Sequence, residues 1–360
     1  MDTKVGPLLA TQIPTAEAQL SFLAKLQRLF SEGDFTATYK FALLIALADL
    51  AVELGTDDGA ELLLSTRQIG ERFILIYWRQ ALPYGMGRPG ASPGILVQSN
   101  GTQAAVISAI ANFQTRHGVA TPQLASGSPE YRTLLSTVTQ TVSAQPLNYL
   151  QNFGGGSDEF IFERAGPGKV KLKSGVTYCL RRFQPLVQQL ARSQWVEHIK
   201  SNRRNHGILG EADDLEDFLF TASRQSLMAV GVGLRKLDGA KCFYCQQALT
   251  GADVDHFVPF SQYPRDLAHN FVLAHPSCNR SKSDTLAAHP HLERWLERLT
   301  RHDDALHEIG QTAGMIGDVQ VSRQIASWGY TSAIMHGASG WLAPTKYELI
   351  DTRYQRYFLS

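Results

Sequence analysis

Cysteine is scarce in this sequence, with four residues in 360. A secreted scaffold held together by disulfides would need more cysteines in a shorter chain, so that class is excluded. Cys242, Cys245 and Cys278 fall within 37 residues, whereas Cys179 stands apart. Clustered cysteines in an otherwise cysteine-poor chain indicate a metal site in a reducing compartment, so we expect a cytoplasmic protein.

Long hydrophobic runs are also absent. The most apolar stretch, Phe41 to Val52, is interrupted by Asp49 and is shorter than the roughly 20 residues that a membrane span requires. We interpret it as a buried helix and expect no membrane association. Met1 to Pro14 contains no basic segment followed by an apolar run, so no secretory signal is predicted.

The chain has little excess charge overall, with a net charge of +1. Any nucleic-acid binding must therefore come from a local basic patch. Between Ile161 and Arg204, ten basic residues face only Glu163 and Glu197. This segment either holds a phosphate backbone or is a solvated face balanced by acids such as those in Glu211 to Asp217. The ten basic residues are Arg164, Lys169, Lys171, Lys173, Arg181, Arg182, Arg192, Lys200, Arg203 and Arg204.

Hydrophobic periodicity predicts a mostly helical first part, followed by the linker candidate Gly154 to Asp158 and a short stretch with strand-like composition. The predicted domains are a helical region of unknown role at 1–150, a mixed basic segment at 159–235 that positions nucleic acid, a domain at 236–290, and helical packing at 291–360. Helices are expected at 15–34, 38–54, 63–82, 103–115, 131–141, 183–199, 213–234, 279–287, 286–299 and 319–328, and strands at 160–162 and 170–180.

The informative stretch runs from Lys241 to Asp284 and contains two superimposed patterns. The first pairs Cys242-x-x-Cys245 with His275-x-x-Cys278. A two-residue spacing lets a tight turn aim both side chains at one ion, and three cysteines with one histidine are a known structural zinc set. We therefore predict a zinc site that joins two distant segments. His269 is a conceivable substitute for His275 as the fourth ligand.

The second pattern is Asp255-His256, then Asn270, then Asn279-Arg280-Ser281-Lys282. Over about 45 to 50 residues this region resembles the HNH endonucleases, also called His-Me finger or ββα-metal nucleases, of the zinc-stabilised type. The resemblance implies a β-hairpin and a helix around one catalytic divalent ion. The expected fold class is α+β, with a mostly helical N-terminal region, a small mixed middle segment and a C-terminal ββα-metal module with a zinc knuckle pair.

Phosphodiester hydrolysis needs an activated water, and imidazole is suited to accepting its proton near neutral pH, so His256 is the expected general base. Asp255 offers a hard carboxylate to Mg²⁺ or Mn²⁺. Adjacent strand residues point to opposite faces, so either the backbone bends or the aspartate reaches round the strand edge.

The family resemblance implies that Asp255 and Asn279 bind the catalytic ion together. It also matches Asn270 to the middle asparagine of the family name, which is expected to fix the hairpin loop and orient His256. Arg280 and Lys282 either contact substrate phosphates or are solvated. Asp253 is given no role beyond support for the residues around it.

These residues predict a metal-dependent endonuclease that cuts nucleic acid, with DNA as the favoured substrate, for which the resemblance suggests restriction or anti-phage defence. Two alternatives remain open. One is a non-catalytic, zinc-stabilised nucleic-acid-binding protein, and the other is a nuclease that stays inactive until a partner or signal activates it.

Overall fold

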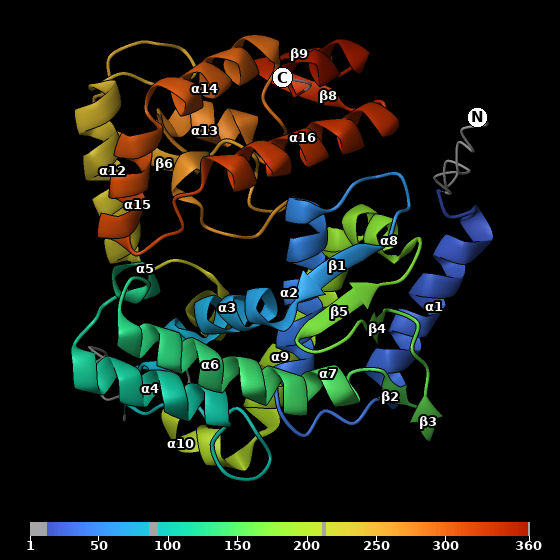
Figure 1. Cartoon of the computed structure of the whole chain (residues 1–360). Coiled ribbons are helices and arrows are strands. Elements are labelled where there is room, and N and C mark those ends of the chain that lie inside the picture. The colour runs from blue at the N-terminus through green and yellow to red at the C-terminus, as the bar shows by residue number, and fades with distance from the viewer. Residues whose placement is uncertain (1–12, 86–92, 211–213, 359–360) are drawn as a thin grey trace, which may run out of the picture.

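The chain folds into two units, each with its own hydrophobic core, and the smaller unit carries the motif-rich region. A computed structural model describes residues 13–85, 93–210 and 214–358. Helices surround four small antiparallel sheets, so the fold is α+β, as expected. Figure 1 shows the N-terminal unit below and the C-terminal unit above, with their ribbons meeting near the end of α2.

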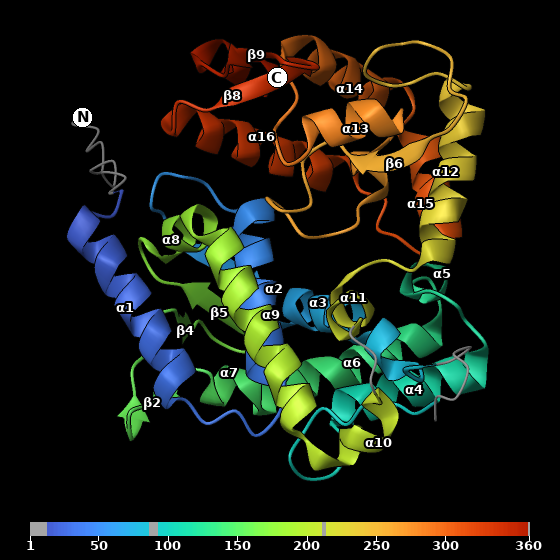
Figure 2. The ribbon, with the colours of Figure 1, turned by 180° about the vertical axis from the view of Figure 1, so that it is seen from behind.

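The N-terminal unit is built around α2, whose side chains are buried along almost its whole length because it is apolar on every side. This helix is the apolar stretch that the sequence analysis interpreted as buried. Helices α3, α8 and α9 pack against it, and Figure 2 shows α9 beside α2 from behind. The helices of this unit are α1 (Ala16–Glu32), α2 (Tyr39–Leu54), α3 (Thr66–Tyr77), α4 (Ala105–His117), α5 (Pro122–Ala125), α6 (Pro129–Ala144), α7 (Pro146–Tyr149), α8 (Val176–Arg182), α9 (Gln184–Ser201), α10 (His206–Leu209) and α11 (Leu215–Phe220).

A three-stranded sheet in the order β1-β5-β4 includes residues that the sequence predicted to be helical. Its strands are β1 (Leu62–Ser65), β5 (Lys169–Leu172) and β4 (Phe162–Arg164). The helix expected over 63–82 starts only at Thr66, because its first residues pair with β5 and Ser65 forms a capping box with Gln68. The strand expected over 170–180 ends early, because Gly175 has a φ of +78° and α8 follows it.

The glycine-rich linker candidate forms a hairpin inside the N-terminal unit. Strands β2 (Asn152–Phe153) and β3 (Gly156–Ser157) pair across Gly154 and Gly155, which adopt φ values of +60° and +77° that favour glycine. Buried residues on both sides of this turn share one core, which extends as far as Leu219. The structure therefore packs the segments 1–150 and 159–219 together within its described residues, rather than separating them at the glycines.

The basic segment is divided among several environments instead of forming one continuous patch. The buried Arg181 pairs with Asp57, and Lys171 pairs with Glu61 and Glu163. Arg192 faces the space between the two units. Residues 211–213 of the acidic stretch that was considered as a counterweight lie outside the described residues.

The C-terminal unit places a two-stranded hairpin between two helices. Strands β6 and β7 pair in register from Asp253↔Ala274 to His256↔Phe271, with α12 packed on both strands and α13 on β6. The helix expected over 213–234 is interrupted, because the Ser223 side chain caps a new helix, α12. The elements of this unit are α12 (Arg224–Asp238), β6 (Asp253–His256), β7 (Phe271–Ala274), α13 (Pro276–Lys282), α14 (His289–Arg301), α15 (Asp303–Ala313), α16 (Val319–Met335), β8 (Ser339–Ala343) and β9 (Lys346–Leu349).

The two units meet through the C-terminal end of α2. Val52 belongs to the core of the C-terminal unit, and α16 packs against α2. The buried Glu53 carboxylate accepts hydrogen bonds from Arg72, from the Tyr263 hydroxyl and from Arg265. No helix in the described ranges is long and apolar enough to cross a membrane.

Asp49 lies one turn before Glu53, and its Oδ2 is 3.6 Å from Arg265 Nε. Burial raises the pKa of Asp49 to about 6, although the Arg265 guanidinium acts in the opposite direction. Because this folded-state pKa exceeds the value of about 3.9 in an unfolded chain, deprotonation of Asp49 destabilises the fold as the pH rises from about 4 to about 6.

We therefore expect the free energy of unfolding of the wild type to fall, relative to that of Asp49→Asn, as the pH rises through this interval. The asparagine is neutral throughout and has no proton to release. Urea denaturation at several pH values measures the difference, with the exposed Asp34→Asn as the control. Parallel pH profiles for the wild type and Asp49→Asn would contradict the assignment.

Candidate functional site

The two cysteines of the first pair lie on a tight hairpin. Cys242 N–H donates to the Gln247 carbonyl at 2.9 Å, and Gln246 N–H donates to the Cys242 carbonyl at 2.9 Å. Gln246 has a φ of +62°, a conformation that L-residues rarely adopt and that closes the turn here. Phe243 N–H donates to the Leu273 carbonyl at 2.8 Å, which fixes the hairpin against β7.

The second pair lies at the start of α13. His275 is its N-cap residue, and Cys278 lies in its first turn. The candidate ligand atoms of Cys242, Cys245, His275 and Cys278 all lie within 4.8 Å of one another. Zinc–sulfur bonds of about 2.3 Å in a tetrahedron separate sulfur atoms by roughly 3.8 Å, so this spacing is consistent with a structural zinc ion.

His275 is the histidine of the cluster, as expected. Its Nδ1 is 3.3 Å from Cys245 Sγ, and its Nε2 is 3.0 Å from the Ala248 carbonyl oxygen. A hydrogen bond from one ring nitrogen to a carbonyl oxygen leaves the other nitrogen for the metal, which is the usual arrangement for a ligating histidine. The substitute, His269, instead pairs with Asp303, with 2.8 Å between Nε2 and Oδ1.

The electrostatics of the cluster favour a cation. Burial raises the pKa of the Cys278 thiol, and the neighbouring Cys242 and Cys245 raise it further by repulsion between thiolates. Burial acts in the same direction on Cys242, but backbone N–H groups outweigh it and lower its pKa. Three sulfurs held this close are compatible with deprotonation only when a positive ion offsets their repulsion.

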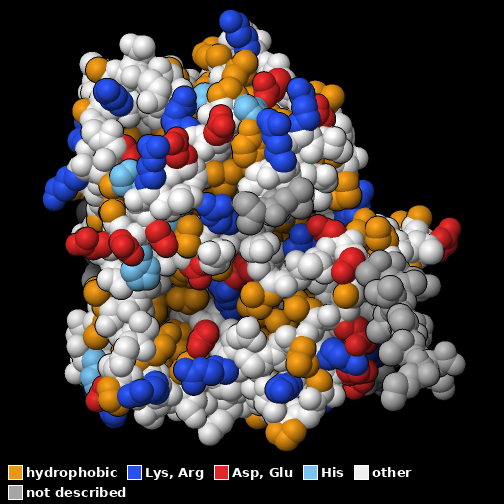
Figure 3. Space-filling view, turned by 45° about the horizontal axis from the view of Figure 1, so that its top comes forward, with side chains coloured by type: hydrophobic (Ala, Val, Ile, Leu, Met, Phe, Trp, Pro, Cys, Tyr) orange, Lys and Arg blue, Asp and Glu red, His pale blue; other side chains and the backbone are white. Residues whose placement is uncertain are grey.

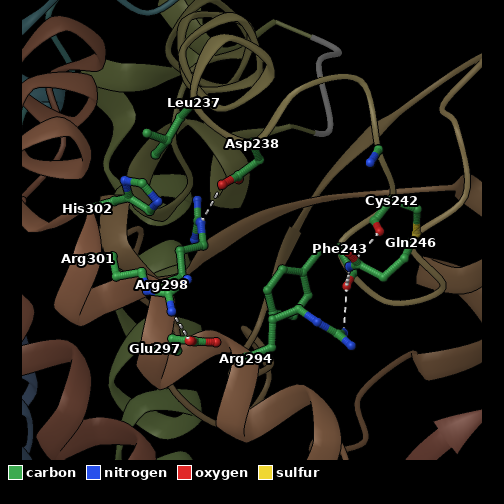
Figure 4. Close-up of a pocket in the computed structure, with 11 residues that line it drawn as sticks. Leu237, Asp238, Cys242, Phe243, Gln246, Arg294, Glu297, Arg298, Arg301 and His302 are labelled. Carbon is green, nitrogen blue, oxygen red and sulfur yellow. Dashed lines mark hydrogen bonds and ion pairs between the residues drawn. The ribbon is translucent and has the colours of Figure 1, made fainter.

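Helix α14 braces the cysteine hairpin (Figure 4). The Arg294 guanidinium donates to the Phe243 carbonyl oxygen at 3.0 Å. The buried Arg298 pairs with Asp238 at 3.0 Å and donates to the Phe271 carbonyl at 3.1 Å. Both arginines line a hollow of about 220 Å³ beside Cys242. Their hydrogen bonds to backbone carbonyls indicate a structural role there.

Three of the catalytic candidates, Asp255, His256 and Asn279, lie on β6 and α13, in the β-hairpin and helix that the resemblance implied, and Asn270 lies just before β7. Side chains alternate along β6, so Asp253 and Asp255 face α13 while His256 leaves the opposite face. The pairing of β6 with β7 is regular through His256. The strand therefore does not bend at these residues, although a bend was one of the two geometries expected. The other edge of β6 has no strand partner in the described part of the chain, whereas its two faces pack against α12 and α13.

His256 is held by a residue that sequence reasoning missed. Its Nε2 is 2.8 Å from Asp266 Oδ1, and the other Asp266 oxygen accepts a hydrogen bond from Ala222 N–H at 2.8 Å. Both side chains are largely buried, with 19% and 12% of their surfaces exposed. The available signal was that Asp266 is the only acidic residue between His256 and Asn270.

Asp255 is already neutralised in this structure. Lys282 Nζ lies 3.2 Å from Asp255 Oδ2 and donates to the His256 carbonyl at 2.9 Å, and the Tyr244 hydroxyl also donates to Asp255 Oδ2. The Lys282 side chain is fully buried. The expectation that Lys282 contacts substrate phosphates is therefore corrected, because its ammonium group forms an internal ion pair.

The two asparagines have different surroundings. Asn279 Nδ2 donates to Asp253 Oδ2 at 3.1 Å, so Asn279 contacts Asp253 rather than the expected partner Asp255. Asn270 bonds Val258 twice, accepting from its N–H at 2.8 Å and donating to its carbonyl at 2.9 Å. Asn270 thus closes the loop that follows His256, while Asp266 orients the imidazole. Arg280 is exposed and remains available for a phosphate.

Two carboxylates and one amide therefore gather where α13 packs on β6. This oxygen-rich set suits a hard divalent cation such as Mg²⁺ or Mn²⁺. The Lys282 ammonium lies beside Asp255, whereas among the described residues the side chains of Asp253 and Asn279 have only each other as hydrogen-bond partners. The donors fit such an ion once the Lys282 side chain gives way.

Comparison with protein families divides the chain into the same two parts. Residues 19–219, more than half of the chain, match a domain of unknown function (DUF8808), and the chain belongs to that family. Residues 242–288 match the HNH endonucleases, from the first cysteine of the cluster to beyond α13. The chain thus carries an HNH endonuclease domain, as the resemblance indicated. Comparisons with curated proteins and with solved structures gave no match.

The cluster predicts that Cys278→Ala loses bound zinc and lowers the melting temperature by at least about 5 °C, since zinc affinity contributes directly to folding. Zinc content and thermal unfolding of the purified variant measure both effects. Cys179→Ala is the matched control, because Cys179 is also buried but lies in the N-terminal unit. Unchanged zinc content in Cys278→Ala would contradict the ligand set.

Proposed function

We propose that the protein is a metal-dependent endonuclease that hydrolyses phosphodiester bonds, with DNA as the favoured substrate. The observation that carries this proposal is the His256–Asp266 pair on the hairpin of a domain that matches the HNH endonucleases. A zinc-stabilised binding module would have no need of a histidine oriented by a carboxylate.

His256 acts as the general base. The Asp266 carboxylate accepts a hydrogen bond from Nε2–H, so the ring proton resides on that nitrogen and Nδ1 keeps its lone pair. Within the described residues, Nδ1 has no recorded hydrogen bond, which leaves it available to accept a proton from the attacking water. Asp266 thereby fixes the tautomer and the direction of the base, as the carboxylate does in other histidine-dependent hydrolases.

Asp255 and Asn279 would hold the divalent ion, and Asp253 lies beside them on the same face. When bound, the ion supplies charge neutralisation at the phosphate and at the leaving oxygen. Arg280, exposed on α13, contacts a neighbouring phosphate of the backbone. Among the described residues no strand pairs with the outer edge of β6, and in this proposal the scissile phosphate lies at that edge, between His256 and the ion.

One observation favours a second candidate, an endonuclease that is held inactive until a partner or signal activates it. The ion pair between Lys282 and Asp255 competes with a divalent cation for the same carboxylate. In such a protein the activating event would displace the buried ammonium. A lack of cleavage by the folded wild type, followed by cleavage after Lys282→Met, would distinguish this form from a constitutive enzyme.

His256→Ala should abolish cleavage, with a loss of at least about 100-fold, because a positioned general base contributes roughly 10² to 10⁴ in rate. The assay compares plasmid DNA, single-stranded DNA and single-stranded RNA with Mg²⁺, Mn²⁺ or EDTA. The control is His336→Ala, an exposed histidine at the end of α16. Cleavage that persists in His256→Ala would exclude this residue as the base.

Asp266→Asn should lower kcat by at least about tenfold while changing KM less than twofold, because it alters the orientation of the base and not substrate binding. A merely structural role would instead lower the melting temperature. The His256→Ala/Asp266→Asn double variant should be no less active than His256→Ala alone. A further additive loss in the double variant would separate Asp266 from the base.

A further inference from the structure

A hollow of about 720 Å³ opens between the two units, and none of the residues proposed to contact the substrate or the ion lines it. Figure 3 shows the surface hollowed between the upper and lower units, with hydrophobic and basic side chains inside. Its walls come from α3, the α4–α5 connection, α9, the segment that joins α11 to α12, and residues 264–266 and 312–316. Small-molecule sites commonly measure about 300 to 1,000 Å³ and lie at domain interfaces.

Two guanidinium groups in this hollow have no acidic partner within ion-pair distance among the described residues. Arg192 donates to the Pro264 carbonyl at 2.7 Å and lies over the Phe220 ring, with 4.8 Å from its central carbon to the ring centroid. Arg79 donates to the carbonyls of Asp217 and Thr221. Burial lowers the pKa of both groups by more than the nearby carboxylates raise it.

The remaining charges of the hollow are already matched. Arg265 pairs with Asp49 and Glu53, and Arg72 pairs with Glu53. Both oxygens of Asp266 are occupied, one by the imidazole of the base and one by a backbone N–H. Buried charges are normally paired, so the two unmatched guanidiniums indicate an anionic ligand.

The lining of the hollow also offers acceptors and an apolar surface. The side-chain oxygens of Gln114 and Gln123 are buried without a hydrogen-bond partner, and both residues line the hollow. Ile76, Val119 and Ile316 lie on the same surface. Buried acceptors without a donor carry a cost that a ligand N–H group removes. A planar ring with exocyclic amino groups, placed against apolar side chains, supplies such donors.

We propose that this hollow, the interdomain cleft, binds a nucleotide, with its phosphate on Arg79 and Arg192 and its base against the glutamine wall. This inference is independent of cleavage, because it rests on charges and acceptors outside β6 and α13. The nucleotide is either a free molecule or one unit of a nucleic-acid strand. Asp266, which lines the cleft, links this site to the proposed base by direct contact with His256.

The test uses the full-length, zinc-loaded His256→Ala protein, so that no probe is cleaved. Calorimetric titration compares the four ribonucleoside 5′-monophosphates, inorganic phosphate and a single-stranded DNA tetramer. We expect at least one nucleotide to bind at least tenfold more tightly than phosphate. Arg79→Gln and Arg192→Gln should each weaken that binding at least tenfold, whereas Arg132→Gln, on the exposed face of α6, should change it less than twofold.

Val119→Trp provides a second variant, which fills the cleft without removing a charge and should abolish binding at an unchanged melting temperature. A tetramer that displaces the mononucleotide identifies a strand unit, and a tetramer that fails to displace it identifies a free nucleotide. The proposal is overturned if neither probe binds the folded protein or if phosphate binds as tightly as every nucleotide. Unchanged affinity in folded arginine variants, or in Val119→Trp, would also overturn it.

Discussion

The buried ion pairs of Arg265 hold the two units in register, and the position of His256 depends on them. Arg265 reaches the carboxylates of Asp49 and Glu53 on α2, which belongs to the N-terminal unit. The next residue in the chain, Asp266, bonds His256. Taking such charges out of water is expensive, so the net stabilisation from the pairs is small. What they provide is geometry, because they fix the loop between β6 and β7 against the C-terminal end of α2.

The metal cluster and the hairpin with its helix were predictable from the sequence because their determinants are close together along the chain. Cys242 and Cys245 define one turn, and His275 and Cys278 define the first turn of α13. Such spacings specify geometry almost without regard to the rest of the protein. The choice between His275 and His269 required the structure, since both histidines lie near the second pair and only their surroundings distinguish them.

The partners of the catalytic candidates were not predictable, because each depends on how distant or alternating residues pack. Lys282 occupies a position of the motif that suggests phosphate binding, yet its buried side chain points inward and pairs with Asp255. Asn279 meets Asp253 because residues two apart on β6 share a face. The sequence predicts a helix from residue 63, but β1 occupies that position because it pairs with β5, which lies more than 100 residues away. The local preference of a segment for helix or strand does not indicate such a long-range pairing.

Helix α12 lies between the two ranges that match known families, 19–219 and 242–288. It nevertheless packs on both strands of the nuclease hairpin, and the segment just before it donates a backbone hydrogen bond to Asp266. The family boundaries therefore mark similarity in sequence and not a mechanical joint. A nuclease domain built in this way is not interchangeable with others of its kind, since a hydrogen bond to Asp266, the partner of His256, comes from chain that the shared motif does not include.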